Sequence, residues 1–175
     1  MKIPIPRRRR RGAILPLVTL CLIILFVFVA LAVDLGVDGS ALDLLTCPHG
    51  GYMAMEGKEV FRRAVRTTVE SGSNALERAK LTPDDIALFV PHQANLRIIE
   101  AAAARLGLPM DRVAVVVDRM GNTSSASIPL ALADAADAGR LAPGDNVLLS
   151  GFGAGMAWGS VVLRWAVDTA GRADP

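Results

Sequence analysis

The sequence is poor in the residues that hold small proteins together by disulfides or metals. It has two cysteines and two histidines among 175 residues, too few for a disulfide framework. Cys21 lies inside an apolar run, and Cys47 is the only cysteine in the rest of the chain. Cys47 and His49 are too few for a zinc site unless His92 and another residue join them, so we expect no metal. No solenoid-type period repeats along the chain, which excludes repeat architectures.

A single apolar segment explains much of the hydrophobic content, which is 52%. Gly12–Val33 contains 22 residues without a charge. At about 1.5 Å per residue, a helix of this length crosses a hydrocarbon core of ~30 Å. Five arginines, Arg7–Arg11, stand directly before it. The pattern predicts a transmembrane helix or signal anchor over residues 12–33. A cleaved signal peptide is the alternative, since Ala30-Leu31-Ala32 is a small-x-small pattern, but the run exceeds the usual length of such peptides.

Charge divides the chain near the same place. The basic N-terminal segment, residues 1–11, carries six Lys or Arg and no acid, whereas the rest carries 13 basic and 17 acidic side chains. Next to an apolar run, clustered arginines are a signal for membrane topology and lipid headgroups rather than for nucleic acid. We therefore expect a single-pass membrane protein with a cytoplasmic N-terminus and no nucleic-acid partner. The positive-inside rule then places residue 35 onward outside the cytoplasm.

The rest of the chain alternates between the patterns of strands and helices. Ile86–Val90 is a short apolar run typical of a buried strand, and Leu96–Leu106 has apolar residues at helical spacing. A second such pair follows at Val113–Val117 and Ser125–Ala138. The alternation predicts an α/β layered fold. The other expected elements are a turn-rich stretch at 35–46, a helix over 57–80 broken at 71–74, strands at 146–150 and 158–165, and a flexible tail at 167–175.

His92 and Asn122 each fall in a turn where a predicted strand gives way to a helix. Side chains at such turns meet ligands in α/β folds. Imidazole and carboxamide N–H groups both donate hydrogen bonds and can hold a developing negative charge without a pKa shift. A purely structural role also explains each of them, because histidines at strand ends often only pack, and Gly-Asn turns use asparagine for its backbone.

Three motifs carry a family resemblance. Val90-Pro-His-Gln-Ala-Asn-Leu-Arg97, Gly121-Asn-Thr-Ser-Ser125 and Gly151-Phe-Gly-Ala-Gly-Met-Ala-Trp-Gly-Ser160 closely resemble, in order and spacing, the C-terminal half of β-ketoacyl-acyl-carrier-protein synthase III. This thiolase-fold enzyme starts bacterial fatty acid synthesis. The resemblance implies half of a thiolase-like α/β/α layered fold over residues 35–166. The flanks of the apolar run, Arg11-Gly-Ala-Ile-Leu-Pro-Leu17 and Ala30-Leu-Ala-Val-Asp-Leu-Gly36, also resemble the anchor of TadE/TadG-type pilus-assembly proteins.

The synthase resemblance implies an acyltransferase chemistry without a cofactor beyond its substrates, acyl-CoA and malonyl-acyl-carrier protein. In the family a cysteine takes the acyl group, and malonyl-carrier protein loses CO₂ to give the carbanion that attacks it. The resemblance assigns polarisation of the malonyl thioester to His92 and Asn122, and an oxyanion backbone donor to Ala154, where a tight bend is the plain alternative. It also places Met55, Gly57 and Asn95 in the substrate tunnel, and Arg62, Arg97 and Arg105 at the docking site for acyl carrier protein, although a basic helix face is usually just solvated.

The chain departs from the family in lacking the half that holds the nucleophile, since neither Cys21 nor Cys47 matches it. We therefore expect decarboxylation at most, with condensation depending on an N-terminal synthase half or dimer partner, and a broad exposed apolar face on the lone half. The alternative is a catalytically inactive, membrane-anchored fusion or truncation product, or an interaction module. The family relatives are cytoplasmic, which conflicts with the topology predicted from charge.

Overall fold

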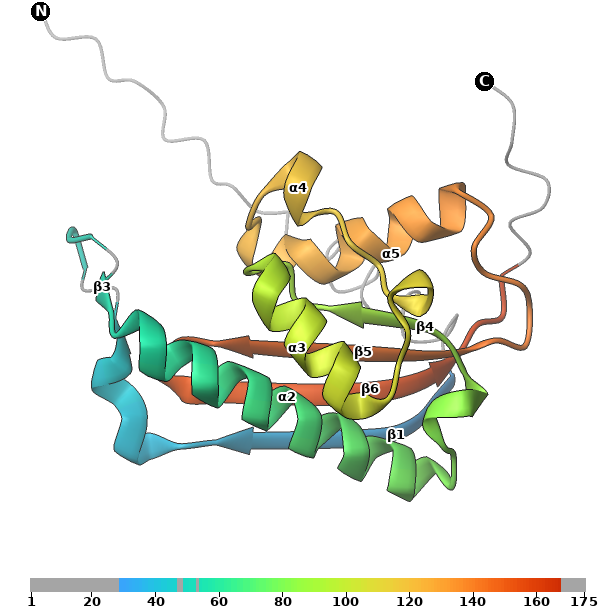
Figure 1. The fold of residues 1–175 in the computed structure, drawn as a ribbon, viewed down its shortest axis with the longest axis horizontal. Helices are drawn as coiled ribbons and strands as arrows, with labels where there is room; N and C mark the ends of the chain where they lie inside the picture. Colours follow the sequence, from blue (N-terminus) through green and yellow to red (C-terminus); the bar gives the residue numbers. More distant parts are fainter. Residues whose placement is uncertain (1–28, 47–48, 53, 168–175) are drawn as a thin grey trace, which may run out of the picture.

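The computed structural model describes residues 29–46, 49–52 and 54–167, and its centre is a four-stranded sheet (Figure 1). The strand order is β1-β6-β5-β4. Strand β5 runs parallel to β4 and antiparallel to β6, which is antiparallel to β1. The bounds are β1 Val29–Val37, β4 Ile86–Pro91, β5 Asn146–Gly153 and β6 Ala157–Arg164, with a separate small ladder of β2 Leu45–Thr46 and β3 Ala54–Met55.

Helices cover both faces of this sheet, as the α/β prediction requires. The long helix α2, Gly57–Ala79, and α3, Leu96–Leu106, lie side by side on one face (Figure 1). Helix α5, Ser127–Asp137, packs against β4 and β5 on the other. The short elements are α4 Val117–Met120 and the 3-10 turns η1 Gly39–Leu44, η2 Pro83–Asp85, η3 Met110–Arg112, η4 Ser124–Ala126 and η5 Ala154–Met156.

The two faces of the sheet bury two apolar clusters. Neighbouring residues of each central strand contribute to opposite clusters, because successive side chains of a strand point to opposite faces. Phe89, Leu148 and Val162 pack with α2 and α3, whereas Val90 and Val147 pack with α5. Strands buried on both sides read as continuous apolar runs, which is why the sequence pattern identified β4 and the first part of β5.

The prediction of a helix over residues 12–33 is wrong for its last five residues, which belong to β1. This strand pairs with β6 from Val29 to Val37. The uncharged run ended at Asp34, yet Asp34 is buried beneath α2 and pairs with Arg78 at 3.1 Å. Residues 29–34 are therefore part of the central sheet rather than of a segment that precedes the globular domain. Residues 12–28 lie outside the described part of the chain. In that described part, no helix has the length and apolar character to cross a bilayer.

The predicted break at residues 71–74 is also wrong, since α2 runs through it without interruption. Ser71 and Gly72 are buried where the helix crosses the sheet, and the Ser71 hydroxyl donates to the Asp34 carbonyl at 3.3 Å. A Cβ at Gly72 would lie 3.3 Å from Leu106 and 3.6 Å from Leu148. The small residues serve close packing of α2 against α3 and β5 rather than a kink.

The strand predicted at Val113–Val117 is reduced to one parallel bridge between Val113 and Phe89. Beyond this bridge the segment forms no ladder with β4. Its backbone groups are bound by the buried side chain of Gln93 instead. Its Nε2 donates to the carbonyls of Pro91 at 2.8 Å and Ala114 at 3.1 Å. Its Oε1 accepts from the backbone N–H groups of residues 116 and 117 at 2.8 and 3.1 Å. One side chain therefore holds together the two segments that lead to His92 and Asn122.

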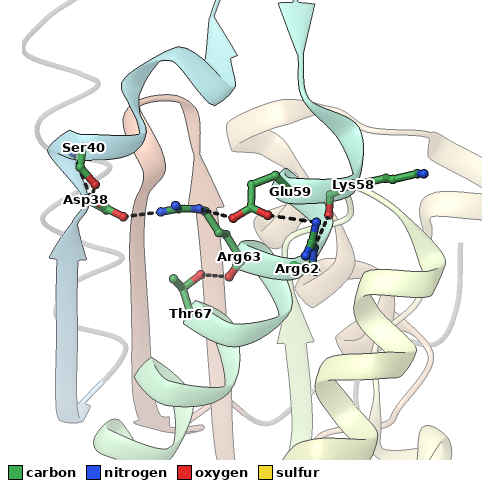
Figure 2. A network of polar contacts seen from close by, with 7 residues as sticks. All are labelled: Asp38, Ser40, Lys58, Glu59, Arg62, Arg63 and Thr67. Atoms are coloured by element: carbon green, nitrogen blue, oxygen red, sulfur yellow. Dashed lines mark hydrogen bonds and ion pairs between the residues drawn. The ribbon is translucent and has the colours of Figure 1, made fainter.

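A polar network joins the end of β1 to the first turns of α2 (Figure 2). Arg63 reaches from α2 between the carboxylates of Asp38 and Glu59, and Glu59 also pairs with Arg62 at 3.3 Å. The hydrogen bond from Ser40, assisted by Arg63, lowers the pKa of Asp38. Arg63 is thus engaged with two carboxylates rather than only solvated. Ion pairs this exposed contribute little free energy, so we assign the network to orienting the start of α2.

On the second face of the sheet, α5 packs against β4 and β5, and among the described residues no other helix lies over β1. Val33, Leu35 and Val37 of β1 are 41%, 75% and 67% exposed. The half-buried Leu149 and Val161 continue the same apolar face across β5 and β6. A contiguous apolar surface of this kind marks an interaction site in soluble proteins.

Candidate active site

His92 lies in the turn between β4 and α3, where the sequence predicted it. Its backbone N–H donates to the Ser150 carbonyl at 2.7 Å, which extends the pairing of β4 with β5 by one residue. Helix α3 then begins after Asn95, whose extended backbone and side-chain oxygen, accepting from the Arg97 N–H at 2.9 Å, form an N-cap. The strand end and the cap together fix the backbone that carries the imidazole.

The imidazole of His92 is half-buried and held from two sides. Its Nδ1 lies 2.6 Å from the hydroxyl oxygen of Ser127, and its ring meets Phe152 edge-on, with centroids 5.4 Å apart and planes at 76°. Burial lowers the pKa of His92 below its ordinary value of 6.5. The ring is therefore neutral at pH 7, with one nitrogen donating and the other accepting.

Asn122 is oriented by its own turn. Gly121 adopts a φ of 69°, and the Asn122 side-chain oxygen accepts from the Ser124 N–H at 3.0 Å. Such an Asx turn uses the oxygen of the amide, and no hydrogen bond within the described residues occupies the two N–H groups of Asn122. The neutral His92 and this amide are two uncharged hydrogen-bond donors that reach the same site from two different turns.

Both side chains line one cavity of about 1290 Å³ beneath the start of α2 and α3. Its wall is mainly apolar, with Val60 and Phe61 from α2, Ile98 from α3 and Ile128 from α5. A concave, mainly apolar cavity with a few converging polar groups is the usual form of a ligand site. Of the residues singled out from the sequence, the wall includes His92, Asn122, Ala154, Met55, Gly57, Asn95, Arg62 and Arg97.

The basic residues of this set divide between two places. Arg62 and Arg97 are exposed where the cavity meets the surface, and Lys58 joins them in its wall. Arg105 is exposed in the last turn of α3. The structure therefore groups two of the three predicted docking arginines at the cavity and separates the third along the helix.

Ala154 lies where β5 ends in the tight turn η5. Gly155 inside this turn has a φ of 74°, a left-handed conformation that favours glycine. The turn brings the backbone at Ala154 to the cavity wall. Cys47 lies outside the described residues, and within the described ones no three His, Cys, Asp or Glu side chains cluster as metal ligands.

Sequence reasoning missed three side chains that shape the site: Ser127, Gln93 and Phe152. All three sit inside or next to the quoted motifs, but no spacing rule ties Ser127 to a histidine 35 residues earlier. Gln93 carried a recognisable signal, because a glutamine that follows a buried strand needs partners for its whole amide. Gln93 is fully buried, and its four hydrogen bonds supply those partners.

Comparison with known proteins identifies the family. Residues 76–165 match the family described as 3-oxoacyl-[acyl-carrier-protein (ACP)] synthase III C terminal, about half of the chain. The chain belongs to this family. Its structural neighbours among these synthases give the fold as the thiolase-like α/β fold.

Individual synthase III relatives agree over most of the described chain. β-Ketoacyl-[acyl-carrier-protein] synthase III of Staphylococcus saprophyticus is 50% identical over 136 residues, which are 77% of this chain and 44% of the relative. The solved synthase III of Thermus thermophilus is 53% identical with a TM-score of 0.73, over 78% of this chain and 46% of that one. The Pseudomonas aeruginosa enzyme is 47% identical with a TM-score of 0.76, over 79% and 44%. The chain thus spans less than half the length of these synthase III relatives. The TadE/TadG-like anchor has no support from the comparisons.

Proposed function

We propose that this domain binds a malonyl thioester and promotes its decarboxylation, as part of a 3-oxoacyl-[acyl-carrier-protein] synthase III reaction in fatty acid biosynthesis. The observation that carries the proposal is the convergence of His92 and Asn122 on one cavity. Two neutral donors suit a step in which negative charge appears on a carbonyl oxygen, because they stabilise the transition state without forming a salt with the substrate carboxylate beforehand.

In the proposed step, the bond between C2 of the malonyl group and its carboxylate breaks and CO₂ leaves. The electron pair moves onto the thioester, whose carbonyl oxygen becomes an enolate oxygen. His92 and Asn122 donate hydrogen bonds to that oxygen. Phe152 packs against His92 and limits rotation of the ring, and the apolar wall excludes water, which strengthens both hydrogen bonds.

Condensation needs one more group, a nucleophile that holds the acyl chain as a thioester. Neither Cys21 nor Cys47 lies in the described residues, so the proposal assigns no acyl carrier to this chain. The backbone N–H of Ala154 is the proposed oxyanion donor for the acyl carbonyl. We propose that the acyl-bearing group reaches the cavity from a further synthase segment, and the exposed apolar face of β1 and β6 offers that segment a surface.

Decarboxylation of malonyl-carrier protein by the purified chain tests this function. We expect release of CO₂, after which C2 of the enolate takes a proton from water to give acetyl-carrier protein. Condensation with acyl-CoA is expected only after the remaining N-terminal portion of a synthase III relative is supplied. A folded chain that binds the thioester without releasing CO₂, with and without that portion, would contradict the proposal.

The same assay addresses a second candidate, an interaction module without turnover. The exposed side chains of Val33, Leu35 and Val37 favour it, because they offer an apolar docking face. Binding without CO₂ release is the outcome that this candidate predicts. If this interaction module is also anchored in a membrane, residues 12–28 must form the anchor. That run is at the short end of the lengths that span a bilayer as a helix.

We further propose that Arg62 and Arg97 receive acyl carrier protein, which is acidic, where the cavity opens. Arg97→Glu is expected to weaken binding of malonyl-carrier protein by about tenfold at low ionic strength, and by less at 0.5 M salt, since such charges mainly steer association and are screened. Titration by fluorescence anisotropy at both salt concentrations measures this. Arg112→Glu is the matched control, because Arg112 is in η3, beyond the far end of α3. Equal affinities for the two variants would remove Arg97 from the docking surface.

A further inference from the structure

Ser127 is the buried neighbour of the histidine, and nothing in the motifs assigns it a role. It is the first residue of α5 and is 1% exposed. Its hydroxyl oxygen has two described partners: the Nδ1 of His92 at 2.6 Å and the backbone N–H of Gln93 at 3.3 Å. The hydroxyl therefore bridges the imidazole and the backbone of the next residue.

The protons of this bridge can be placed by elimination. The Gln93 N–H can only donate, so the Ser127 oxygen accepts from it. The hydroxyl has one proton of its own to give. Among the contacts of the described residues, Nδ1 of His92 is the one acceptor within its reach. Nδ1 therefore accepts, and in a neutral imidazole the proton then sits on Nε2.

The opposite arrangement is unfavourable. If Nδ1 carried the proton, the hydroxyl oxygen would accept from both His92 and Gln93, and its own proton would be buried without an acceptor. A buried donor without a partner loses its hydrogen bonds to water and gains none in return. The buried position of Ser127 thus makes one tautomer of His92 more favourable than the other.

We propose that Ser127 is a positioning residue that holds His92 in the tautomer with its proton on Nε2, the nitrogen left for a ligand in the cavity. A donor at Nε2 suits a ligand with an anionic or enolate oxygen, whereas the other tautomer would present a lone pair and repel it. The catalytic consequence rests on the proposed function, but the tautomer itself is a property of the protein without substrate.

Nuclear magnetic resonance on the chain labelled with ¹³C and ¹⁵N at histidine tests the proposal directly. The chain has two histidines, so His92→Ala assigns the spectrum and His49 serves as an internal reference. In the unmodified protein near pH 7.5, the ring nitrogens of His92 should show the Nε2–H pattern alone, with Nδ1 shifted as a hydrogen-bond acceptor. Ser127→Ala should move His92 toward the mixture of a free imidazole and raise its pKa, because the hydroxyl donates only to the neutral ring.

Two further variants separate positioning from packing. Ser125→Ala removes an exposed hydroxyl from the same cavity wall and should leave the tautomer and the titration of His92 unchanged. Ser127→Thr keeps the hydroxyl and should restore the Nε2–H pattern that Ser127→Ala loses. Identical spectra and titration of His92 in the unmodified chain and in Ser127→Ala would overturn the proposal.

The activity assay gives a separate answer. Ser127→Ala should lower kcat for decarboxylation by roughly tenfold with little change in KM, and shift the acidic limb of the pH profile upward with the pKa of His92. A changed tautomer in a chain that decarboxylates no malonyl thioester would support the role of Ser127 and contradict the proposed function instead.

Discussion

Replacing His92 by alanine is expected to lower kcat for malonyl-thioester decarboxylation by about 10²- to 10³-fold, with a much smaller change in thioester affinity. Removing one preorganised donor to a developing oxyanion costs about that factor. The affinity should persist because the apolar wall of the cavity and the basic residues at its edge are untouched. Stopped-time assays of CO₂ release over a range of substrate concentrations separate kcat from KM. The assay uses whichever sample decarboxylates malonyl-carrier protein, either the chain alone or the chain mixed with the remaining synthase portion.

Asn122 allows a sharper version of this experiment, because its side-chain oxygen holds the turn and its side-chain nitrogen is the proposed donor to the enolate. Asn122→Asp keeps an oxygen to accept from the Ser124 N–H and so preserves the turn. The variant loses the N–H donors and brings a negative charge toward the enolate. We expect it to fold normally and to lose at least as much kcat as Asn122→Ala.

The double variant and a control complete the set. His92→Ala combined with Asn122→Ala should cost less than the product of the single effects, because both donors serve the same oxygen. Ser125→Ala, in the same wall, should change kcat less than twofold. Normal turnover by either His92→Ala or Asn122→Asp would remove that residue from the reaction.

The sequence predicted those parts of the fold and site that depend on local pattern. The strand before His92 and the helix after it were correct because buried apolar runs and helical spacing are periodic signals. His92 follows a strand, as predicted, whereas Asn122 follows the short helix α4, because the strand predicted before it is reduced to a single bridge. Of the eight site residues found in one cavity, His92 and Asn122 were singled out by their positions in turns, and the other six came from the family resemblance. The chemical roles of all eight stay predictions.

The errors share a physical cause, which is that tertiary contacts override local pattern. Residues 29–33 looked like the end of a membrane helix because they continue the uncharged run, and Asp34 looked like its polar end. In the fold Asp34 is part of β1 and is paired with Arg78 under α2. Ser71 and Gly72 looked like a helix break because the pattern does not reveal a close neighbour such as Leu106. Val113–Val117 looked like a strand because it is an apolar run. Several of its backbone groups are bound by the side chain of Gln93 instead of a neighbouring strand.

The side chain of Gln93 should be among the most sensitive to substitution when the free energy of unfolding is measured. Gln93→Leu is expected to lower the free energy of unfolding by about 3–5 kcal/mol, because similar volume is kept while four backbone groups lose their partner. Each buried donor or acceptor left alone costs about 1–3 kcal/mol, and partial relaxation keeps the total below the sum. The two carbonyls belong to Pro91 and Ala114, and the two N–H groups to residues 116 and 117.

Urea unfolding followed by circular dichroism measures this loss, and Asn95→Ala provides the scale. Asn95 caps α3 two residues further along, at the surface. Loss of an N-cap typically costs about 1 kcal/mol, so the buried variant should shift the midpoint several times further than the exposed one.

If Gln93→Leu unfolded at the same urea concentration as Asn95→Ala, the four hydrogen bonds would not be what holds the 113–117 segment. In that case the approach of Asn122 to His92 would need another cause. If the expected loss is found, one buried amide stabilises the backbone of both turns that supply the proposed donors. Mutations at Gln93 should then reduce catalysis and stability together, whereas Asn122→Asp should reduce catalysis alone.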